Sequence, residues 1–342
     1  RIGLAPLSGG TADAMSCACL MAAQLGSALR VITRGGPPDP SDFNATNARN
    51  GVSWSGNVDF RFISIFDDRT LVDLGSHDLF LATSWWAAWS LLQAVNPGRI
   101  LYLVQEDERL LYPVGDEHLV CGNVMGNENI RFIVSSRPLY DHLTGDGLQA
   151  IARHGCWFEP AFPAAQYFGE RYFGERPGGE RRTLLFHSRP DAGRTLYESG
   201  LATINLALQR GVLSADAWDI HLLGAEEEDV ILAGGFRPIV HRDVDWSAYL
   251  QLLRRTDLGL CLTGSPHPGG PALALAACGA AVVTDSFRRK TSLTGYSASI
   301  LCVEPALEAL AKGLVQGAAL AGDDRARRDN AGTSGIARDY QR

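Results

Sequence analysis

Residues 264–279 read Gly-Ser-Pro-His-Pro-Gly-Gly-Pro-Ala-Leu-Ala-Leu-Ala-Ala-Cys-Gly, a glycine-rich loop that runs into a short apolar segment. Apolar runs at 258–262 and 281–284 flank this stretch, and both are predicted to be buried strands. Pro271 at the first helical position and Gly279 just beyond the last one indicate a short crossover helix between the strands. The stretch therefore predicts a strand, loop, helix, strand unit, which is the repeating element of a parallel α/β sheet.

The loop of this unit is suited to an anionic ligand. Backbone N–H groups at the start of a helix lack partners within the helix, and the helix dipole favours negative charge there. Small residues let a phosphate group approach the backbone closely. We therefore predict a phosphate site formed by Ser265, His267, Pro268, Gly269 and Gly270, with His267 at its rim. The alternative for His267 is a loop histidine whose imidazole is hydrogen-bonded to backbone.

The composition is that of a globular protein long enough for two domains, with 342 residues of which 46% are hydrophobic and 20% are charged. The net charge of −7 argues against a nucleic-acid partner, because binding a polyanion normally requires a basic face. The seven cysteines form no CxxC pair and no zinc-type spacing with histidine. We expect them to be reduced packing residues and the protein to be cytoplasmic. No apolar run approaches the roughly 18 residues of a membrane span.

Short apolar strands alternate with helical patterns along the chain, which predicts an α/β protein with doubly wound parallel sheets. The first strand leads through the turn Ser8-Gly9-Gly10 into a helix over 12–25, for which Thr11 is the expected N-cap. In the first half, strands are expected at residues 2–6, 29–33, 61–65, 79–83, 100–104 and 131–135.

The alternating pattern breaks around residues 155–182, where proline, glycine and charged residues dominate. We predict an N-terminal Rossmann-like domain over 1–165, a linker over 166–182 and a C-terminal Rossmann-like domain over 183–320. Residues 321–342 are expected to form a polar, mobile tail that can return to the N-terminal domain. The second half is expected to hold further strands at 183–186, 219–223 and 239–240 and helices at 193–209 and 246–255.

Two sets of motifs resemble known glycosyltransferases. The second half of the chain resembles glycosyltransferase family 4. The segments that carry this resemblance are Leu-Leu-Phe-His-Ser-Arg-Pro-Asp-Ala-Gly-Arg at 184–194, Ser265 to Pro268, Leu273 to Gly279 and Val-Val-Thr at 282–284. In the first half, similarity to bacterial rhamnosyltransferases of surface-layer and O-antigen glycan synthesis is carried by residues 102–108, 112–115 and 132–136. Those three segments read Tyr-Leu-Val-Gln-Glu-Asp-Glu, Tyr-Pro-Val-Gly and Phe-Ile-Val-Ser-Ser.

The resemblance implies a GT-B fold, in which two Rossmann-like domains face each other across a cleft. It also implies that the domain over 1–165 lies on the acceptor side and that the domain over 183–320 binds the nucleotide-sugar donor. It implies transfer of a sugar, a deoxyhexose such as rhamnose, from a nucleoside-diphosphate sugar to a glycan or lipid-linked glycan acceptor in cell-surface polysaccharide synthesis. It also implies a retaining hexosyltransferase that needs no metal and no cofactor beyond its donor. Two alternatives stay open: a noncatalytic module that binds a glycan or a nucleotide sugar, and a nucleotide-sugar epimerase of the same fold.

One feature departs from the family 4 pattern. The family carries two glutamates eight positions apart, of which the second contacts the ribose of the nucleotide, and this chain has Pro266 and Ala274 there. Neither side chain can accept a hydrogen bond from a hydroxyl group. Ribose recognition therefore lacks its usual acceptor, and this motivates the binding-module alternative.

Negative charge grows on the leaving diphosphate in the implied reaction, so the site must offer cationic or N–H donors. Arg189 and Arg194 follow the strand 183–186 and are the first candidates, because a guanidinium group can bind phosphate through two hydrogen bonds. The alternative is a pair of solvated arginines at the start of a surface helix. Further donor-site candidates in the same half are Ser188, Gly224 and His241.

Residues at strand ends in the first half are candidates for the other side of the site. Gly9 and Gly10 could complete the phosphate site, although a Gly-Gly pair after a strand is also ordinary turn chemistry. Trp85 and Gln105 are expected to face the acceptor. Asp107 could act as a general base if the reaction inverts, and its alternative is a solvated loop residue.

Two charged stretches have structural alternatives. Asp243 and Asp245 have the Asp-x-Asp spacing of a metal motif, but Asp245 directly precedes the helix 246–255, so we predict an N-cap and no catalytic metal. The run Arg-Arg-Lys at 288–290 is predicted to be a solvated basic face. It could attract an anionic glycolipid or the cytoplasmic membrane surface, which would give the protein a peripheral membrane contact.

Overall fold

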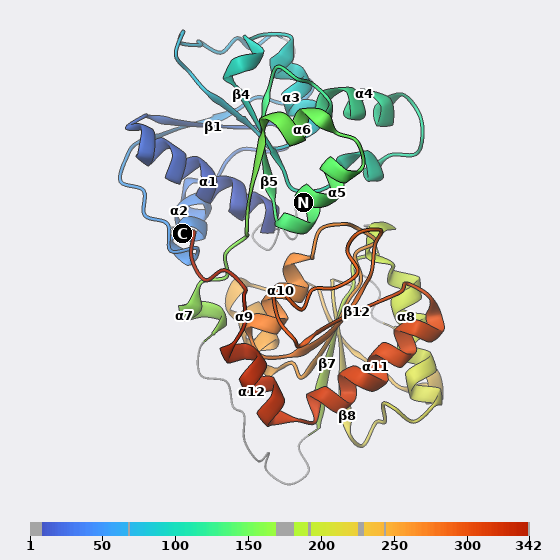
Figure 1. Ribbon diagram of the computed structural model, residues 1–342. Helices are drawn as coiled ribbons and strands as arrows, with labels where there is room; N and C mark the ends of the chain where they lie inside the picture. The colour runs from blue at the N-terminus through green and yellow to red at the C-terminus, as the bar shows by residue number, and fades with distance from the viewer. Residues whose placement is uncertain are drawn as a thin grey trace. The chain divides into compact units, whose positions relative to one another are not determined.

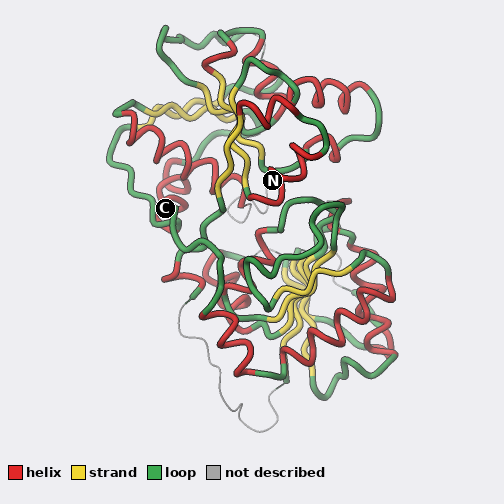
Figure 2. Tube along the Cα trace, viewed as in Figure 1, coloured by secondary structure: helices red, strands yellow, loops and turns green. Residues whose placement is uncertain are grey.

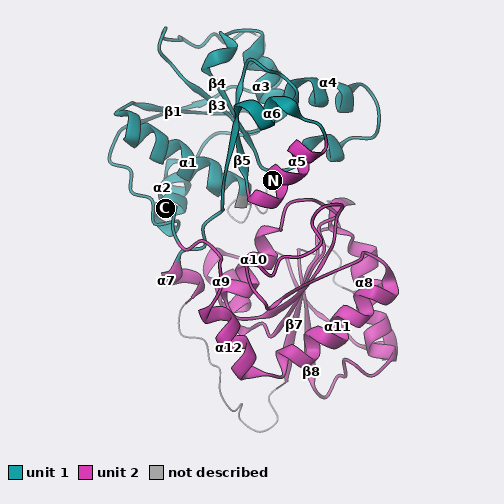
Figure 3. Cartoon of the chain, in the orientation of Figure 1, with its two compact units in different colours: residues 1–135, 147–163, 339–342 teal, residues 136–146, 164–338 magenta. Residues whose placement is uncertain are grey.

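The computed structural model describes residues 9–67, 69–168, 181–190, 193–224, 229–242 and 244–340. The chain divides into two compact units, which Figure 3 draws in different colours. Unit 1 comprises residues 1–135, 147–163 and 339–342, and unit 2 comprises residues 136–146 and 164–338. Residues 136–146 of the predicted first domain thus group with unit 2, and the last residues of the predicted tail group with unit 1.

Among the described residues, unit 1 holds two parallel sheets (Figure 1). The larger sheet has the strand order β3-β4-β5-β6, and β1 pairs with β2 in a separate two-stranded sheet. The strands are β1 (Leu29–Thr33), β2 (Val58–Phe62), β3 (Phe80–Ala82), β4 (Ile100–Val104), β5 (Arg131–Ser135) and β6 (Gly155–Phe158). The strand predicted at 61–65 is shifted to β2, because Val58 and Phe60 pack against the small core around Phe43. The strand predicted at 2–6 lies outside the described residues.

The first helix corrects the prediction of a glycine turn. α1 spans Gly9–Leu25, so Gly9 and Gly10 are its first two residues, and Thr11 lies inside the helix instead of capping it. Glycine can adopt the helical backbone as well as a turn, and the apolar residues that follow stabilise the helix by packing. The other helical segments of unit 1 are α2 (Pro40–Arg49), α3 (Trp85–Leu92), η2 (Pro97–Arg99), η3 (Glu108–Leu111), α4 (Asp116–Met125) and α6 (Gln149–His154).

Unit 2 is built on a six-stranded parallel sheet with the order β12-β11-β10-β7-β8-β9. Figure 2 shows these strands in yellow with helices on both sides. The strands are β7 (Arg182–His187), β8 (Trp218–Leu223), β9 (Ile239–His241), β10 (Leu258–Cys261), β11 (Ala281–Asp285) and β12 (Ile300–Val303). The strand order reverses between β7 and β10, and this switch point is where ligands bind in open parallel sheets. The predicted α/β class with parallel sheets is confirmed.

Helices cover both faces of the sheet in unit 2 (Figure 1). α8 and α11 pack together on one face, and α9 and α10 lie on the other. The helical segments are α5 (Arg137–Gly145), α7 (Ala164–Tyr167), η4 (Gly193–Thr195), α8 (Tyr197–Gln209), η5 (Ala233–Gly235), α9 (Trp246–Arg255), α10 (Gly270–Ala277), α11 (Leu307–Ala321) and α12 (Asp324–Gly332). No helix among the described residues is long and apolar enough to cross a membrane.

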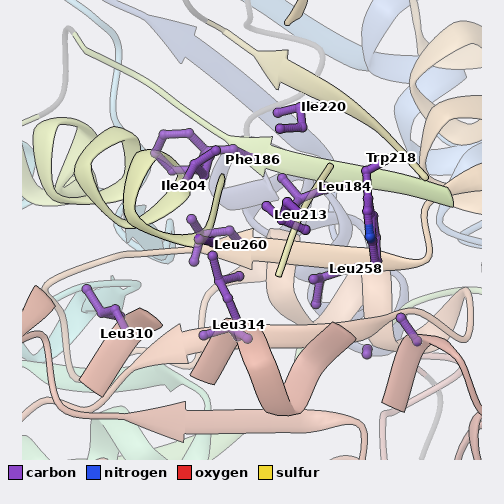
Figure 4. Packing of buried hydrophobic residues seen from close by; sticks show 14 of the residues in the cluster. Leu184, Phe186, Ile204, Leu213, Trp218, Ile220, Leu258, Leu260, Leu310 and Leu314 are labelled. Carbon is purple, nitrogen blue, oxygen red and sulfur yellow. The ribbon is translucent and has the colours of Figure 1, made fainter. Parts of the chain in front are cut away.

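The core of unit 2 joins the sheet to α8 and α11 (Figure 4). Alternate residues of the central strands point into it, among them Leu184 and Phe186 of β7 and Leu258 and Leu260 of β10. The opposite face of β10 presents Gly259, where an added Cβ atom would lie 2.6 Å from Leu275 Cδ1. The missing side chain therefore lets α10 approach the sheet closely, as packing of the crossover helix requires.

The predicted tail is in part a structured element. α12 spans Asp324–Gly332, and Arg327 on this helix is 1% exposed. Its Nη1 donates to Asp257 Oδ1 at 2.9 Å, and its Nε donates to the carbonyl of Gly279 at 2.9 Å. The expectation of a mobile polar tail is therefore wrong for α12, because a buried ion pair with a distant residue holds it against the sheet.

Candidate functional site

The loop after β7 carries Arg189 at the switch point of the sheet in unit 2. Ser188 is buried and its N–H donates to the carbonyl of Leu223 at 2.9 Å, which continues the pairing of β7 with β8 by one residue. Burial, assisted by the Arg189 charge, lowers the pKa of the neighbouring His187 to about 4. The first predicted arginine is thus presented by a rigid strand end next to a neutral imidazole.

Gly224, after β8, lies directly against this loop. Its φ is +90°, and an added Cβ atom would lie 2.5 Å from the Ser188 carbonyl oxygen and 3.4 Å from Arg189 Cγ. Its N–H donates to the carbonyl of His241 at 2.9 Å. The structure therefore brings together Ser188, Arg189, Gly224 and His241, and it explains why only glycine fits at the closest approach.

Arg194 lies beside the loop that follows β10. Gly264 in that loop has φ +51°, and its added Cβ atom would lie 3.0 Å from the Arg194 carbonyl oxygen. Thr195 Oγ1 donates to the carbonyl of Arg189 at 2.7 Å, so the residue that follows Arg194 lies against the backbone of Arg189. Arg194 is exposed and Arg189 is half-buried, and both therefore remain candidates for phosphate binding.

His267 is oriented by hydrogen bonds within its own loop. Its N–H donates to Ser265 Oγ at 3.0 Å, and its Nδ1 accepts the N–H of Gly269 at 3.0 Å. Burial, followed by the charges of Arg194 and Lys290, lowers the pKa of His267 to about 3. The imidazole is therefore neutral with its proton on Nε2, since Nδ1 is the acceptor. The hydrogen bond from Gly269 to Nδ1 is the backbone contact that the alternative interpretation of His267 predicts. A contact between Nε2 and a ligand stays a prediction.

The loop ends at the start of α10 as the sequence predicts. Gly269 is the N-cap with φ +87°, Gly270 and Pro271 open the helix, and Gly279 follows its end with φ +82°. Pro268 and Ser265 are buried in the loop, where they shape the backbone. Ala274 is 2% exposed on the same helix, so its position offers no side-chain acceptor for a ribose hydroxyl.

Two charged residues support this loop, a role that the sequence did not predict. Lys290 and Asp285 have fully buried side chains, and Lys290 Nζ lies 3.6 Å from Asp285 Oδ2. The prediction of a solvated basic face at 288–290 is therefore wrong for Lys290, because its side chain turns inward to a carboxylate at the end of β11. Arg288 fits the prediction better, since its side chain is 52% exposed and contacts Asp146 at 3.3 Å.

The Asp-x-Asp spacing has a structural explanation at its second residue. Asp245 is the N-cap of α9, and its Oδ1 accepts the N–H of Ala248 at 2.8 Å. The predicted capping role is confirmed, because the carboxylate satisfies a backbone donor that the helix cannot. Asp243 lies outside the described residues.

In unit 1, the structure brings two predicted residues into contact. Gln105 follows β4, and its Nε2 donates to the carbonyl of Gly10 at 2.7 Å. An added Cβ atom on Gly10 would lie 3.2 Å from Gln105 Oε1, so glycine permits this close approach. Gln105 is half-buried and holds the first turn of α1 next to the end of β4.

Asp107 and Trp85 have structural partners. The Asp107 carboxylate is 1% exposed and receives two hydrogen bonds of 2.8 Å from Arg109, so the alternative of a solvated loop residue is wrong. A carboxylate neutralised by a bidentate guanidinium group is a poor proton acceptor, which argues against a general base. Trp85 is buried, and its Nε1 donates to the Tyr112 hydroxyl at 2.9 Å, while its N–H donates to Glu108 at 3.0 Å.

Sequence comparison relates the chain to proteins of glycan synthesis. Residues 182–315 match the family model described as WsaF, C-terminal domain. The chain is 29% identical to the O-antigen biosynthesis protein RfbC of Myxococcus xanthus over 235 aligned residues. The alignment covers 67% of this chain. The chain spans only 17% of the length of that relative.

Similar solved structures cover nearly the whole chain. The structure of Anabaena HepE in complex with UDP and glucose aligns with a TM-score of 0.57 at 13% sequence identity. The alignment covers 95% of this chain and 92% of the HepE chain. A glycosyltransferase from Rickettsia africae has a TM-score of 0.57 at 11% identity, covering 96% and 92%. Sucrose-phosphate synthase from Thermosynechococcus elongatus has a TM-score of 0.53 at 14% identity, covering 90% and 95%. This chain therefore has the fold of the GT-B glycosyltransferases.

Proposed function

We propose that the chain is a glycosyltransferase that uses a nucleoside-diphosphate sugar as donor and a glycan as acceptor. The observation that carries the proposal is the grouping of Arg189, Arg194 and His267 with the start of α10 at the switch point of one parallel sheet. The ligands of a similar structure support the proposal, since HepE has been crystallised in complex with UDP and with UDP-glucose. The name of the Myxococcus relative supports a glycan of the O-antigen type.

The proposed reaction exchanges one bond at the anomeric carbon for another. The bond from that carbon to the diphosphate oxygen breaks, the acceptor oxygen bonds to the carbon, and the acceptor proton passes to the released diphosphate. Negative charge grows on the leaving diphosphate, so Arg189 and Arg194 would act by charge and the loop N–H groups by hydrogen bonding. Because Asp107 is neutralised by Arg109, we favour the retaining course, in which the departing phosphate takes the proton. The similarity at 102–108 supports a deoxyhexose donor such as rhamnose.

The test is release of nucleoside diphosphate from a panel of nucleotide sugars in the presence of a lipid-linked glycan acceptor. Arg189→Ala is expected to lower kcat by about 10²–10³, which is the usual effect of losing one donor to a developing anion. Arg237→Ala is the matched control, because Arg237 precedes β9 at the other end of the sheet and its side chain is 69% exposed. Equal activity of Arg189→Ala and the wild type would refute the site.

A second candidate function is a noncatalytic module that binds a nucleotide sugar. The buried Ala274 favours it, because no side chain there can accept a hydrogen bond from ribose. The same panel separates the two functions. Binding of UDP-sugars without any released diphosphate would select the module, and turnover would exclude it.

A further inference from the structure

Lysine is rare in this chain, and one of its lysines is buried. Of 31 basic residues only Lys290 and Lys312 are lysines. Lys312 is exposed on α11, whereas the Lys290 side chain is 0% exposed. A buried ammonium group is costly unless it is paired and hydrogen-bonded, so its surroundings indicate what it does.

The partners of Lys290 lie on the predicted donor loop. Its Nζ donates to Thr263 Oγ1 at 3.1 Å and to the carbonyl of His267 at 3.4 Å. The ammonium group therefore joins the beginning of the loop to its middle. Since the side chain is enclosed, Lys290 itself cannot touch a substrate.

Asp285 completes the arrangement from the end of β11. Its Oδ1 accepts the N–H of Thr263 at 2.6 Å, and its Oδ2 accepts the N–H of Gly264 at 3.0 Å. The same Oδ2 lies 3.6 Å from Lys290 Nζ. One carboxylate thus holds the first turn of the loop, and the paired ammonium group extends that hold to His267.

Lys290 also acts on the charge of His267. Burial is the main cause of the lowered pKa of this imidazole, and the charges of Arg194 and Lys290 lower it further. The hydrogen bond from the Gly269 N–H to Nδ1 requires that the proton of the neutral ring sits on Nε2. His267 in this state can donate a hydrogen bond from Nε2, and it can neither carry positive charge nor act as a base there.

We propose that the Asp285–Lys290 ion pair is a positioning device that fixes the loop 263–270 and orients His267 to donate a hydrogen bond from Nε2. The inference rests on the proposed function for its effect on turnover. Asp285 and Lys290 are positioning residues, and they act on the donor only through the backbone and the imidazole that they hold. A buried ion pair is weak evidence for stability but suits a device that must orient several polar groups at once.

The first test is made on the wild-type chain and needs no turnover. The ¹⁵N signals of the His267 imidazole are assigned by comparison with His267→Gln and followed from pH 8 to pH 3. The expected result is a ring protonated on Nε2 that stays uncharged down to about pH 4, because its pKa is lowered to about 3. A His267 pKa above 5, or a ring protonated on Nδ1, would overturn the proposal.

The second test removes the charge with little change of shape. Lys290→Met is expected to raise the measured pKa of His267 by about 1, as loss of a neighbouring like charge should. It is also expected to lower kcat/KM by about 10²-fold, because displacement of a positioned group by about 1 Å can cost that much. Lys290→Arg should restore part of the activity, and Lys312→Met is the matched control that should leave both quantities unchanged.

The outcomes separate this inference from the proposed function. Should the wild type turn over no nucleotide sugar, the proposed function fails, while the His267 spectra and the affinity for inorganic pyrophosphate still test the ion pair. An active, folded Lys290→Met with unchanged His267 spectra and unchanged kcat/KM would refute the ion pair alone. Where Lys290→Met does not fold, Asp285→Asn is measured in its place, and the wild-type spectra decide in any case.

Discussion

Replacing Arg327 by methionine should destabilise unit 2 strongly without touching the donor site. Methionine keeps the apolar stem but removes the guanidinium group, which bonds Asp257 and the carbonyls of Gly279 and Ala321. Asp257 is fully buried, and its other oxygen accepts the N–H of Thr183 at 2.9 Å. The variant therefore leaves a carboxylate in the interior with too few donors.

The magnitude follows from these contacts. Breaking a buried ion pair by removing one partner costs about 3–5 kcal/mol. Each carbonyl left without its partner adds up to about 1 kcal/mol if water cannot reach it. A loss near 5 kcal/mol is a large part of the roughly 5–15 kcal/mol that stabilises a typical protein. We therefore expect Arg327→Met to fold marginally at room temperature.

The assay is hydrogen exchange at the amides of β10 and β11, together with urea-induced unfolding. Arg325→Met is the matched control, because Arg325 lies on the same helix with a side chain that is 93% exposed. The control should change stability by less than about 0.5 kcal/mol. Adding Asp257→Asn to Arg327→Met should recover about 1–3 kcal/mol, because the amide removes the unpaired charge and still accepts the Thr183 N–H. A loss under about 1 kcal/mol in Arg327→Met would refute the reasoning.

Gly224→Ala should lower the free energy of unfolding by about 1–3 kcal/mol and weaken pyrophosphate binding, because φ is +90° and the Cβ atom would lie 2.5 Å from the Ser188 carbonyl oxygen. Gly211→Ala is its control in calorimetry, since φ there is +69° in open space, and an equal effect in both variants would show that strain alone acts. Burial raises the pKa of Asp13 from 3.8 to about 7 against the opposing hydrogen bond from Tyr340. The folded state then holds a proton that the unfolded state releases, so the free energy of unfolding should fall as pH rises from about 4 to 7. Asp13→Asn should flatten this dependence in urea titrations, and parallel pH profiles of the two proteins would contradict it.

Local patterns were sufficient where a segment forms its structure largely from its own residues. β4 and β5 were predicted at their observed bounds, because each is a short apolar run that continues into polar residues. α9 was predicted from its apolar spacing and its aspartate cap. The loop before α10 was predicted from proline and glycine positions, which act through backbone preferences alone.

Local patterns failed where distant residues decide. β6 was not predicted as a strand, because it lies where the alternating pattern breaks. It is a four-residue strand at the sheet edge, and its pairing with β5 is not visible in its own sequence. Lys290 was assigned to a solvated run, although its partners include Thr263, which is 27 residues away. Arg327 was placed in a mobile tail, although it bonds a residue 70 positions earlier. Burial of a charge depends on such partners, which composition and spacing do not reveal.

The two buried ion pairs occupy opposite ends of the same part of the sheet, so their variants should separate stability from site geometry. Asp257 directly precedes β10 and pairs with Arg327, whereas Asp285 ends β11 and pairs with Lys290. The first pair holds α12, where Arg327 also donates to the carbonyls of Gly279 and Ala321. The second pair bonds the donor loop at Thr263, Gly264 and His267. Below its unfolding transition Arg327→Met should therefore keep the wild-type kcat/KM and His267 spectra, while Lys290→Met should change both. The opposite result would exchange the two assignments.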